Sequence, residues 1–599
     1  MDKGIVVLDF GGQYSHLIAN RIRRLRVYAE IRSPQVSLAD LEGVRGIVLS
    51  GGPSSVYAAD QPAYNPEIFS AGIPLLGLCY GHQLLSQQLG GRVEPGATME
   101  YGAATLRVTA AKGVLQDLGP EERIWMSHRD TVVALPPGFE VLGRTEDCPI
   151  AAMGDQARRI YGLQFHPEVS HTEKGTQILD RFVELCGCER TWTMESFVED
   201  SVARIRAQAA GRKVFLFVSG GVDSSVCFVL LNRALGEERV LGLHIDNGFM
   251  RKDESALVRR AMADAGFRNL EVVDAGAEFL AEVAGVADPE EKRRRIGAEF
   301  LRVRDRVLEQ LHLDPEEWLL SQGTLYPDTI ESGGTAHAAV IKTHHNRVDV
   351  IEQLLARGRV VEPLAQLYKD EVRALGELLG LPHHLIWRHP FPGPGLAVRV
   401  LCSDGREEME GIAQAAPAAA RIGAEYGVGV EILPLRSVGV QGDGRTYAHP
   451  AVVAGQADWT RLEELSTALT NAVPQINRVI WQLGPHPLPA QRPIRGYLTR
   501  ERLDLLREAD AVVMEALERH GLMAQVDQMP TVLVPLSSDG ARESVVLRPI
   551  STDDFMTARF SLLPQEFLAD VTARLLALPQ IDAVFYDITH KPPGTVEWE

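Results

Sequence analysis

A glycine-rich run, Ser219-Gly220-Gly221-Val222-Asp223-Ser224, is the feature that most constrains the fold of this chain. It follows an apolar segment at 214–218 that is typical of a buried strand, and it precedes a helix-like segment at 225–231. At the start of a helix, backbone N–H groups converge and the helix dipole adds roughly half a positive charge. Glycines let the backbone come close to a phosphate group. The sequence therefore predicts an anion-binding turn between a strand and a helix.

This run differs from the kinase-type phosphate loop, because no Gly-Lys-Ser/Thr follows it. It resembles instead the pyrophosphate-binding loop of enzymes that cleave ATP to AMP and pyrophosphate while activating an oxygen atom. The resemblance implies that the chain adenylates an acceptor. An ordinary glycine turn leading into a helix is the alternative interpretation.

The segments around the loop predict a nucleotide-binding sheet. Further strands are expected at 239–245, ending at Asp246, and at 269–273, with helices at 225–235 and 254–265. A strand and turn are also expected at 322–328. This alternation predicts a doubly wound fold that binds its ligand at the carboxyl ends of the strands.

Length and composition limit the other possibilities. The 599 residues are too many for one core and suggest about three to four domains. A net charge of −19 argues against nucleic acid as the main partner. No run of about 18 apolar residues is present, so no membrane span is expected. Six cysteines in so long a chain do not form a disulfide framework, and a cytoplasmic protein without a signal peptide is expected. Cys186 and Cys188 are interpreted as structural thiols.

Residues 1–190 alternate between strand-like and helix-like segments, which predicts an α/β domain with parallel strands. Strands are expected at 5–9, 46–50 and 73–78, and a helix at 14–25. The third strand stops at Cys79, and a helix is expected at 83–89. A cysteine on such a sharp turn is typical of a nucleophile elbow, where the helix dipole favours the thiolate. A buried structural cysteine is the alternative for Cys79 taken alone.

A possible base follows another predicted strand at 159–164. His166 can accept a proton, and Glu168 can orient the imidazole ring and fix its tautomer. Cys79, His166 and Glu168 resemble the triad of class I glutamine amidotransferase domains. The resemblance implies that Cys79 forms a glutamyl thioester and that ammonia is released.

The same resemblance assigns three further residues. Gly52 and the backbone N–H of Tyr80 match the oxyanion hole, and Gln83 is expected to help hold glutamine. One departure is visible, since Arg129 stands where the family has glycine, between His128 and Asp130. If that turn requires a positive φ, an arginine would alter the shape of the loop.

Segments along nearly the whole chain resemble the family of glutamine-hydrolysing GMP synthases. They include 8–11, 341–346, 389–396 and the C-terminal segment 587–599. The resemblance implies a carbon–nitrogen ligase of purine (GMP) biosynthesis, in which xanthosine 5′-monophosphate (XMP) is adenylated by ATP with Mg²⁺ and then aminated to GMP. The ammonia comes from glutamine. From the residues alone, only a glutamine-fed amidation that converts ATP to AMP follows.

Site roles are carried over by matching motifs to positions in this sequence. ATP is expected at Ser219, Gly220, Gly221, Val222, Asp223, Ser224, Ser225 and Asp246, and Asp223 is also expected to hold Mg²⁺. XMP is expected at Arg293, Lys342, Asp443, Arg445, Gln528, Lys591 and Glu597. For the basic run 292–295 taken alone, a solvated helix face is the alternative.

The region after about residue 400 contains a repeat. Segment 433–437 resembles 534–538, and segment 473–481 resembles 578–586, which predicts two copies of one α+β unit. The expected domains are an amidotransferase domain (1–190), an adenylating domain (191–395), a first α+β copy (396–490) and a second copy with the XMP-binding tail (491–599). The fold class is therefore α/β multidomain with a duplicated α+β end. If the first copy replaces the partner subunit of the family's shorter form, the protein is a monomer with an internal pseudo-dimer. A homodimer is the alternative.

Two other functions stay open at this point. One is another glutamine-dependent amidotransferase that uses the same two modules on a different acceptor. The other is a catalytically silent regulatory homologue. A tRNA-modifying enzyme is disfavoured by the net charge of −19.

Overall fold

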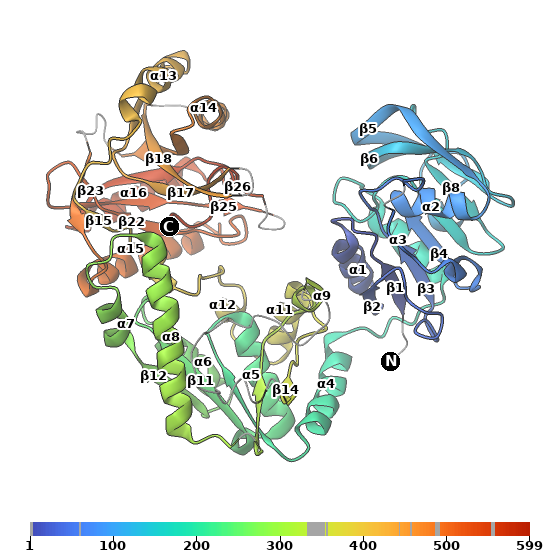
Figure 1. Cartoon of the computed structure of the whole chain (residues 1–599), viewed down its shortest axis with the longest axis horizontal. Helices are drawn as coiled ribbons and strands as arrows, with labels where there is room; N and C mark the ends of the chain where they lie inside the picture. The colour runs from blue at the N-terminus through green and yellow to red at the C-terminus, as the bar shows by residue number, and fades with distance from the viewer. Residues whose placement is uncertain are drawn as a thin grey trace. The chain divides into compact units, whose positions relative to one another are not determined.

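The computed structural model describes residues 4–58, 61–314, 316–331, 354, 357–441, 444–455, 458–484, 491–552 and 557–599. The chain divides into two compact units, unit 1 (Met1–Asp200) and unit 2 (Ser201–Glu599). Figure 1 labels their helices and strands. Among the described residues, none of the helices is both long and apolar enough to cross a membrane.

Unit 1 is built on a nine-stranded sheet in the order β2-β1-β3-β4-β9-β8-β7-β5-β6. The pairs from β2 to β9 are parallel, and those from β9 to β6 are antiparallel. β1, β3 and β4 are buried along their whole length, which explains why each is a continuous apolar run. The strands are β1 (Ile5–Leu8), β2 (Ala29–Arg32), β3 (Gly46–Leu49), β4 (Leu75–Leu78), β5 (Arg92–Val108), β6 (Glu121–Ala134), β7 (Glu140–Arg144), β8 (Ala152–Asp155) and β9 (Ile160–Leu163). The helices are α1 (Ser15–Arg24), α2 (Tyr80–Gln88) and α3 (Gly175–Leu185), with short 3-10 helices η1 (Pro66–Ser70) and η2 (Gly113–Leu115). Helix α4 (Met194–Ala209) begins in unit 1 and ends in unit 2.

The strands and helices predicted in unit 1 are present within one to a few residues of their expected ends. The main difference is α2, which begins at Tyr80, directly after Cys79, and not at Gln83. The glycine at position 81 and the polar side chains that follow it hide the start of this helix from a hydrophobic pattern.

The first part of unit 2 is a five-stranded parallel sheet in the order β12-β11-β10-β13-β14. This is a doubly wound order, as the sequence predicts, and it reverses beside β10. The glycine-rich run follows β10 and therefore lies at the crevice where such sheets bind ligands. The strands are β10 (Lys213–Phe217), β11 (Val240–Asp246), β12 (Leu270–Asp274), β13 (Trp318–Ser321) and β14 (Val360–Val361). The helices are α5 (Val222–Leu235), α6 (Glu254–Asp264), α7 (Gly276–Glu282), α8 (Pro289–Leu311), α9 (Tyr326–Glu331), α11 (Lys369–Leu378) and α12 (His383–Ile386), with η3 (Glu237–Arg239) and η4 (Gly395–Val398).

A strand and turn are expected at 322–328, and the position of the strand is wrong. β13 ends at Ser321, and α9 begins at Tyr326 within the predicted segment. Pro327 explains the difference, because proline is favoured in the first turn of a helix and breaks a central strand.

The rest of unit 2 contains a sheet in the order β16-β18-β19-β27-β24-β22, with β17 paired to β18. Read from either end, the pairing is antiparallel and then parallel, and the two central strands β19 and β27 pair antiparallel. The strands are β15 (Ser403–Asp404), β16 (Gly429–Ile432), β17 (Ser437–Gln441), β18 (Gly444–Ala454), β19 (Ile476–Leu483), β20 (Arg492–Pro493), β21 (Arg495–Gly496), β22 (Thr531–Val534), β23 (Leu536–Ser537), β24 (Glu543–Leu547), β25 (Ile550–Ser551), β26 (Arg559–Phe560) and β27 (Ile581–Asp587). The helices are α13 (Ile412–Glu425), α14 (Trp459–Ala472), α15 (Arg500–Arg519) and α16 (Gln565–Leu576).

The two halves of this sheet share a local contact as well as an element order. In the first half, the Ser437 hydroxyl donates to Asn477 Oδ1 at 2.9 Å. In the second half, the Ser538 hydroxyl donates to Asp582 Oδ1 at 3.0 Å. These paired positions fall in the segments whose sequences resemble each other. The duplication itself stays a proposal, which this correspondence supports.

The sheet separates two apolar layers. Alternate residues of its strands, such as Val453 and Val545, join the helices in one large core. The intervening residues, such as Val452 and Phe585, form a second core that Trp598 of the C-terminal segment helps to fill. The C-terminal segment is therefore part of the packing of the sheet.

Candidate functional site

Cys79 lies on a sharp turn between β4 and α2, with φ of +53°. Its N–H donates to the Leu163 carbonyl at 2.8 Å, which ties the turn to β9. Glycines on both sides allow the turn to pack tightly. A Cβ at Gly77 would lie 2.3 Å from the Gly81 carbonyl oxygen, and one at Gly81 would lie 2.4 Å from the Leu49 carbonyl oxygen. The local structure is the strained elbow that the sequence predicts.

His166 and Glu168 complete a buried triad with Cys79. His166 Nδ1 donates to Glu168 Oε1 at 2.7 Å, and the two residues are 4% and 1% exposed. Burial alone would lower the pKa of His166, but the charge of Glu168 and hydrogen bonds to Cys79 and Glu168 raise this pKa well above its usual value. The arrangement therefore favours an imidazolium that can exchange a proton with the Cys79 sulfur.

The turn after β3 lies against the triad. A Cβ at Gly51 would lie 3.4 Å from His166 Cε1 and 3.7 Å from Cys79 Cβ. A Cβ at Gly52 would lie 3.4 Å from Tyr80 Cγ. Tyr80 is the first residue of α2, so its N–H has no partner within the helix. The oxyanion-hole assignment of Gly52 and Tyr80 stays a prediction, which this proximity supports.

Gln83 is buried in α2, and its side-chain amide is held by the protein. Its Nε2 donates to the Asp130 carbonyl at 2.7 Å and to Gln164 Oε1 at 3.1 Å. The amide nitrogen is thus already used in internal hydrogen bonds. If Gln83 helps hold glutamine, it does so through the amide oxygen.

The segment that carries Arg129 is ordinary strand. It lies in β6, Arg129 is exposed, and its φ is not positive. The Cys79 thiol donates to the neighbouring Ser127 carbonyl at 3.4 Å. An arginine in place of glycine therefore leaves this part of the site intact.

The glycine-rich loop has the hydrogen bonding of a preformed anion site. Gly220 has a φ of +83°, and α5 begins two residues later. The Ser219 hydroxyl accepts from the Gly221 N–H at 3.2 Å and lies 3.1 Å from the Ser224 hydroxyl. The hydroxyl of Ser225 is buried and has no hydrogen-bond partner among the described residues. These contacts hold the loop open at the N-terminus of α5.

Two basic residues that sequence reasoning missed contact this loop. Lys369 Nζ bonds both carboxylate oxygens of Asp223 at 2.6 and 2.7 Å. Arg388 donates to the Gly220 carbonyl and to Glu254 Oε1, the latter at 2.6 Å. Burial lowers the pKa of Arg388, and the charge of Glu254 opposes this shift. Both residues lie far along the chain from the loop, and the only local signal is that Arg388 directly precedes the motif at 389–396.

A carboxylate joins two of the residues predicted to bind XMP. Glu290 Oε1 accepts from Arg293 at 2.9 Å, and from Arg445 and Tyr447 at 2.7 Å each. The hydrogen bond from Tyr447, followed by that from Arg445, lowers the pKa of Glu290. Glu290 and Tyr447 also line a cavity of about 500 Å³ that reaches Trp598 and Glu599. The N-terminal end of α8 therefore contacts the C-terminal sheet region (Figure 1).

The C-terminal segment is held against the first half of the sheet. Glu597 accepts two hydrogen bonds from the buried Arg399, at 2.8 and 3.0 Å. The Val440 N–H donates to the Pro593 carbonyl at 2.8 Å, so the segment follows β17. Arg399 was missed, and its only signal is that it closely follows the proline- and glycine-rich motif at 389–396.

Gln528 and Lys591 flank the short β25–β26 pair. The Gln528 carbonyl accepts from the Ile550 N–H at 2.9 Å, and the Lys591 N–H donates to the Ala558 carbonyl at 2.8 Å. Their roles toward XMP stay predictions. The predicted residues Lys342 and Asp443 lie outside the described residues.

A solvated helix face does not describe the whole run 292–295. Lys292 is fully buried, forms an ion pair with Glu599 and donates to the Val400 carbonyl at 3.0 Å. Arg294 is exposed and pairs with Glu291 on its own helix. The spacing of helix faces explains the difference, because neighbouring residues of an α-helix point in different directions.

Three family models match successive parts of the chain. The family model for glutamine amidotransferase class-I matches residues 6–186. The model for NAD synthase matches residues 192–308, and the model for the GMP synthase C terminal domain matches residues 515–598.

Full-length relatives are similar over almost the whole sequence. The chain is 43% identical to the probable GMP synthase [glutamine-hydrolyzing] of Leptospira interrogans, over 100% of this chain and 99% of that protein. It is 45% identical to the GMP synthase [glutamine-hydrolyzing] of Thermobifida fusca, over 99% and 98% of the two chains. It is 46% identical to that of Symbiobacterium thermophilum, over 99% of each. With the triad, the doubly wound sheet and the C-terminal domain in one chain, the protein belongs to the family of glutamine-hydrolysing GMP synthases.

Proposed function

We propose that this protein makes GMP from XMP, ATP and glutamine. Unit 1 hydrolyses glutamine, and unit 2 adenylates and aminates XMP. The observation that carries the proposal is Cys79 at the strained elbow beside the buried His166–Glu168 pair. Such a triad releases ammonia from glutamine, and a doubly wound sheet with a pyrophosphate loop supplies the activated acceptor.

In the glutaminase step, the Cys79 sulfur adds to the side-chain carbonyl carbon of glutamine. The backbone N–H groups of Gly52 and Tyr80 stabilise the negative charge that forms on the oxygen. His166 donates its proton to the leaving nitrogen, so ammonia departs and a thioester remains. Water then adds to the thioester with His166 as base, and glutamate and free Cys79 are released. Glu168 keeps the imidazole ring oriented through both stages.

In the synthetase step, the C2 oxygen of XMP attacks the α-phosphorus of ATP and pyrophosphate leaves. Ammonia then adds at C2, loses a proton and displaces AMP. We assign the ATP phosphates to the loop at 219–225, with Asp246 at the neighbouring strand end.

The carboxylate of Asp223 is partly exposed and of the type that Mg²⁺ prefers, so it fits a metal that accompanies ATP. The ion would neutralise phosphate charge there. Since Lys369 holds both carboxylate oxygens, this ion pair must open when Asp223 binds a metal.

XMP is assigned to the region where Arg293 and Arg445 meet at Glu290, close to the C-terminal segment with Lys591 and Glu597. Two guanidinium groups at one place suit an anionic nucleotide. Arg445 lies in the first half of the sheet and Lys591 in the second, and the contact of the C-terminal segment with β17 brings the two halves together.

We further propose that the protein is a monomer in which the two halves of the sheet form an internal pseudo-dimer. The antiparallel pairing of β19 with β27 at the centre of the sheet supports this arrangement. Sedimentation at micromolar concentration tests it, and a stable dimer would contradict it. A cytoplasmic location remains a prediction from the sequence.

The function is tested by measuring GMP formation from XMP and ATP with either glutamine or ammonium. The wild type should use both nitrogen sources, and Cys79→Ala only ammonium. Cys188→Ala, a half-buried thiol elsewhere in unit 1, is the matched control and should use both. If no variant makes GMP from ammonium, XMP is not the acceptor. If Cys79→Ala still uses glutamine, the glutaminase assignment is wrong.

A further inference from the structure

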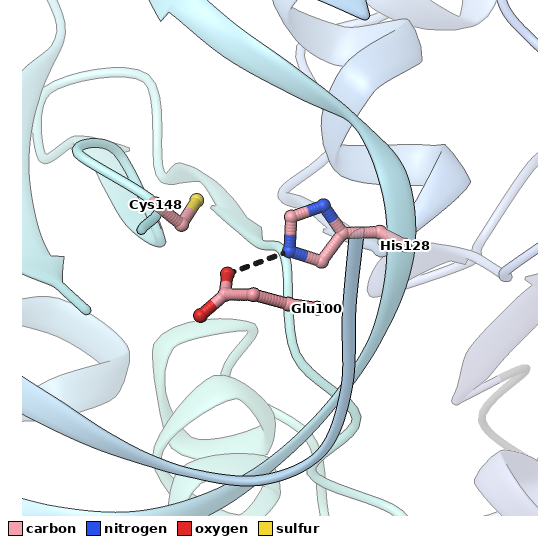
Figure 2. Close-up of side chains that lie close together, drawn as sticks. All are labelled: Glu100, His128 and Cys148. Carbon is pink, nitrogen blue, oxygen red and sulfur yellow. Dashed lines mark hydrogen bonds and ion pairs between the residues drawn. The ribbon is translucent and has the colours of Figure 1, made fainter. Parts of the chain in front are cut away.

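A carboxylate, an imidazole and a thiol, all groups that can bind a metal ion, lie close together in unit 1. They are Glu100 from β5, His128 from β6 and Cys148 from the loop before β8. One ligand atom of each lies within 4.8 Å of the others. Figure 2 shows the carboxylate, the imidazole and the sulfur turned toward a common point. His128 and Cys148 are buried, and the Glu100 side chain is 11% exposed.

The hydrogen bonds of His128 leave one nitrogen available as a ligand. Its Nδ1 lies 3.0 Å from the Asp130 carbonyl oxygen, which can only accept, so Nδ1 carries a proton. In the neutral ring, Nε2 then has a free lone pair. Nε2 lies 3.0 Å from Glu100 Oε2, which is also an acceptor when ionised. When Glu100 is ionised, two acceptors face each other, and either a proton or a metal ion must lie between them.

Each of the three groups is also held by an outer partner. The Thr145 hydroxyl donates to Glu100 Oε1 at 2.9 Å, and the Thr131 hydroxyl lies 3.4 Å from Cys148 Sγ. The Asp130 carbonyl orients the His128 ring. Metal sites in proteins have this second layer of hydrogen bonds, which fixes the tautomer and orientation of each ligand.

We propose that Glu100, His128 and Cys148 bind one Zn²⁺ ion, with the fourth position open to water or another small ligand. Nitrogen, sulfur and oxygen donors together suit zinc, and a thiolate and a carboxylate neutralise its two charges. At zinc bond lengths, tetrahedral ligand atoms lie about 3.3–3.8 Å apart, so the Glu100–His128 pair need open by only a few tenths of an ångström. The ion would release a proton from the Cys148 thiol as it binds, because the thiolate is the form that coordinates a metal.

Such an ion would act on the strand that supports the nucleophile. The Asp130 carbonyl that orients His128 also accepts from Gln83, and the Ser127 carbonyl accepts from the Cys79 thiol. Metal binding would fix the residues between these two carbonyls. The ion would thus be a structural element of the glutaminase site and would take no part in the reaction. The inference concerns binding alone and does not depend on the identity of the acceptor substrate.

The test is a Co²⁺ titration of full-length, chelator-treated protein carrying Cys79→Ala, so that the catalytic thiol does not compete. We expect one Co²⁺ per chain, a thiolate-to-cobalt charge-transfer band, and displacement by Zn²⁺. Adding Cys148→Ser should abolish the band. Adding His128→Asn, which retains a donor for the Asp130 carbonyl, should weaken binding at least about tenfold.

Cys186→Ser is the matched control. Cys186 is another buried thiol of unit 1, and it interacts with Cys188 and not with the proposed ligands. This substitution should leave the band unchanged. Thr145→Val, which keeps all three ligands, should weaken binding roughly 10–100-fold and covers the case in which Cys148→Ser does not fold. A band that survives Cys148→Ser or disappears with Cys186→Ser would overturn the site. No binding of Co²⁺ or Zn²⁺ would overturn the proposal and show that a proton, and not a metal ion, joins His128 to Glu100.

Discussion

Asp587, at the end of β27, is a carboxylate that accepts hydrogen bonds from two buried guanidinium groups. It accepts from Arg478 at 2.8 Å and from Arg548 at 3.2 Å, and neither arginine is exposed to solvent. It also accepts from the Trp598 indole N–H at 2.9 Å and from the Thr589 N–H at 3.0 Å. Burial lowers the pKa of Arg478 to about 10, and the charge of Asp587 opposes this shift. The charge of Asp587 therefore offsets the free-energy cost of burying the two guanidinium groups.

We predict that Asp587→Asn strongly destabilises unit 2. The variant loses the negative charge and half of the acceptor capacity, while both arginines stay buried. Removing one partner of a buried ion pair costs about 3–5 kcal/mol. The surface carboxylate Asp570, which pairs with Arg519 at 3.0 Å and is partly exposed, provides the control. Asp570→Asn should cost less than about 1 kcal/mol.

The same change should weaken substrate binding. Arg478 donates to the carbonyl of Glu597 at 2.8 Å and to the Thr595 hydroxyl at 2.6 Å, so Asp587 orients the arginine that holds the C-terminal segment. We expect KM for XMP to rise while glutamine hydrolysis, measured alone, keeps its wild-type rate.

The free energy of unfolding is measured in urea by tryptophan fluorescence, together with XMP kinetics. Equal effects of Asp587→Asn and Asp570→Asn on unfolding would refute the reasoning, since the carboxylate would then not offset the buried guanidinium charges. A loss of stability without any change in KM for XMP would separate the packing of the C-terminal segment from substrate binding.

Three further predictions concern the other sites. Because Glu168 raises the pKa of His166, the stabilisation that this pair provides is fully present below about pH 6.5 and is lost as pH rises through the higher folded-state pKa. Glu168→Gln should therefore lower Tm more at pH 6 than at pH 9, and a constant offset would contradict this. Gly395→Ala should destabilise unit 2 by at least about 1 kcal/mol in urea unfolding, because φ is +65° and the new Cβ would lie 2.3 Å from the Phe249 carbonyl oxygen. A wild-type midpoint would show that the turn adapts. Lys369→Met should lower GMP formation from ammonium and leave glutamine hydrolysis unchanged, and unchanged synthesis would remove Lys369 from the phosphate site.

The features that the sequence predicts correctly are local. The loop at 219–224 and the elbow at Cys79 each combine a buried apolar strand, glycines and a helix start within about a dozen residues. Their geometry follows from backbone constraints that act over that distance. The same holds for β1, β3 and β4 of unit 1, which are continuous, buried apolar runs.

The features that were missed depend on contacts between distant segments. Lys369 reaches Asp223 from α11, and Arg399 reaches Glu597 from the other end of the C-terminal region. Lys292 lies in a run of charges that is typical of a solvated helix, yet it is buried against Glu599. Side-chain pairing across such separations has no periodic or compositional signal, so only the folded chain reveals it.

The backbone of Cys79 has a consequence for how this enzyme can change over time. At φ of +53° and ψ of −106°, a residue with a Cβ atom is strained by about 1–3 kcal/mol, and glycine would relieve that strain. Selection for stability alone would thus replace the nucleophile, and the position keeps its thiol only while ammonia release is required. A copy of this gene freed from that requirement would be expected to lose Cys79 early and to gain thermal stability as it did so.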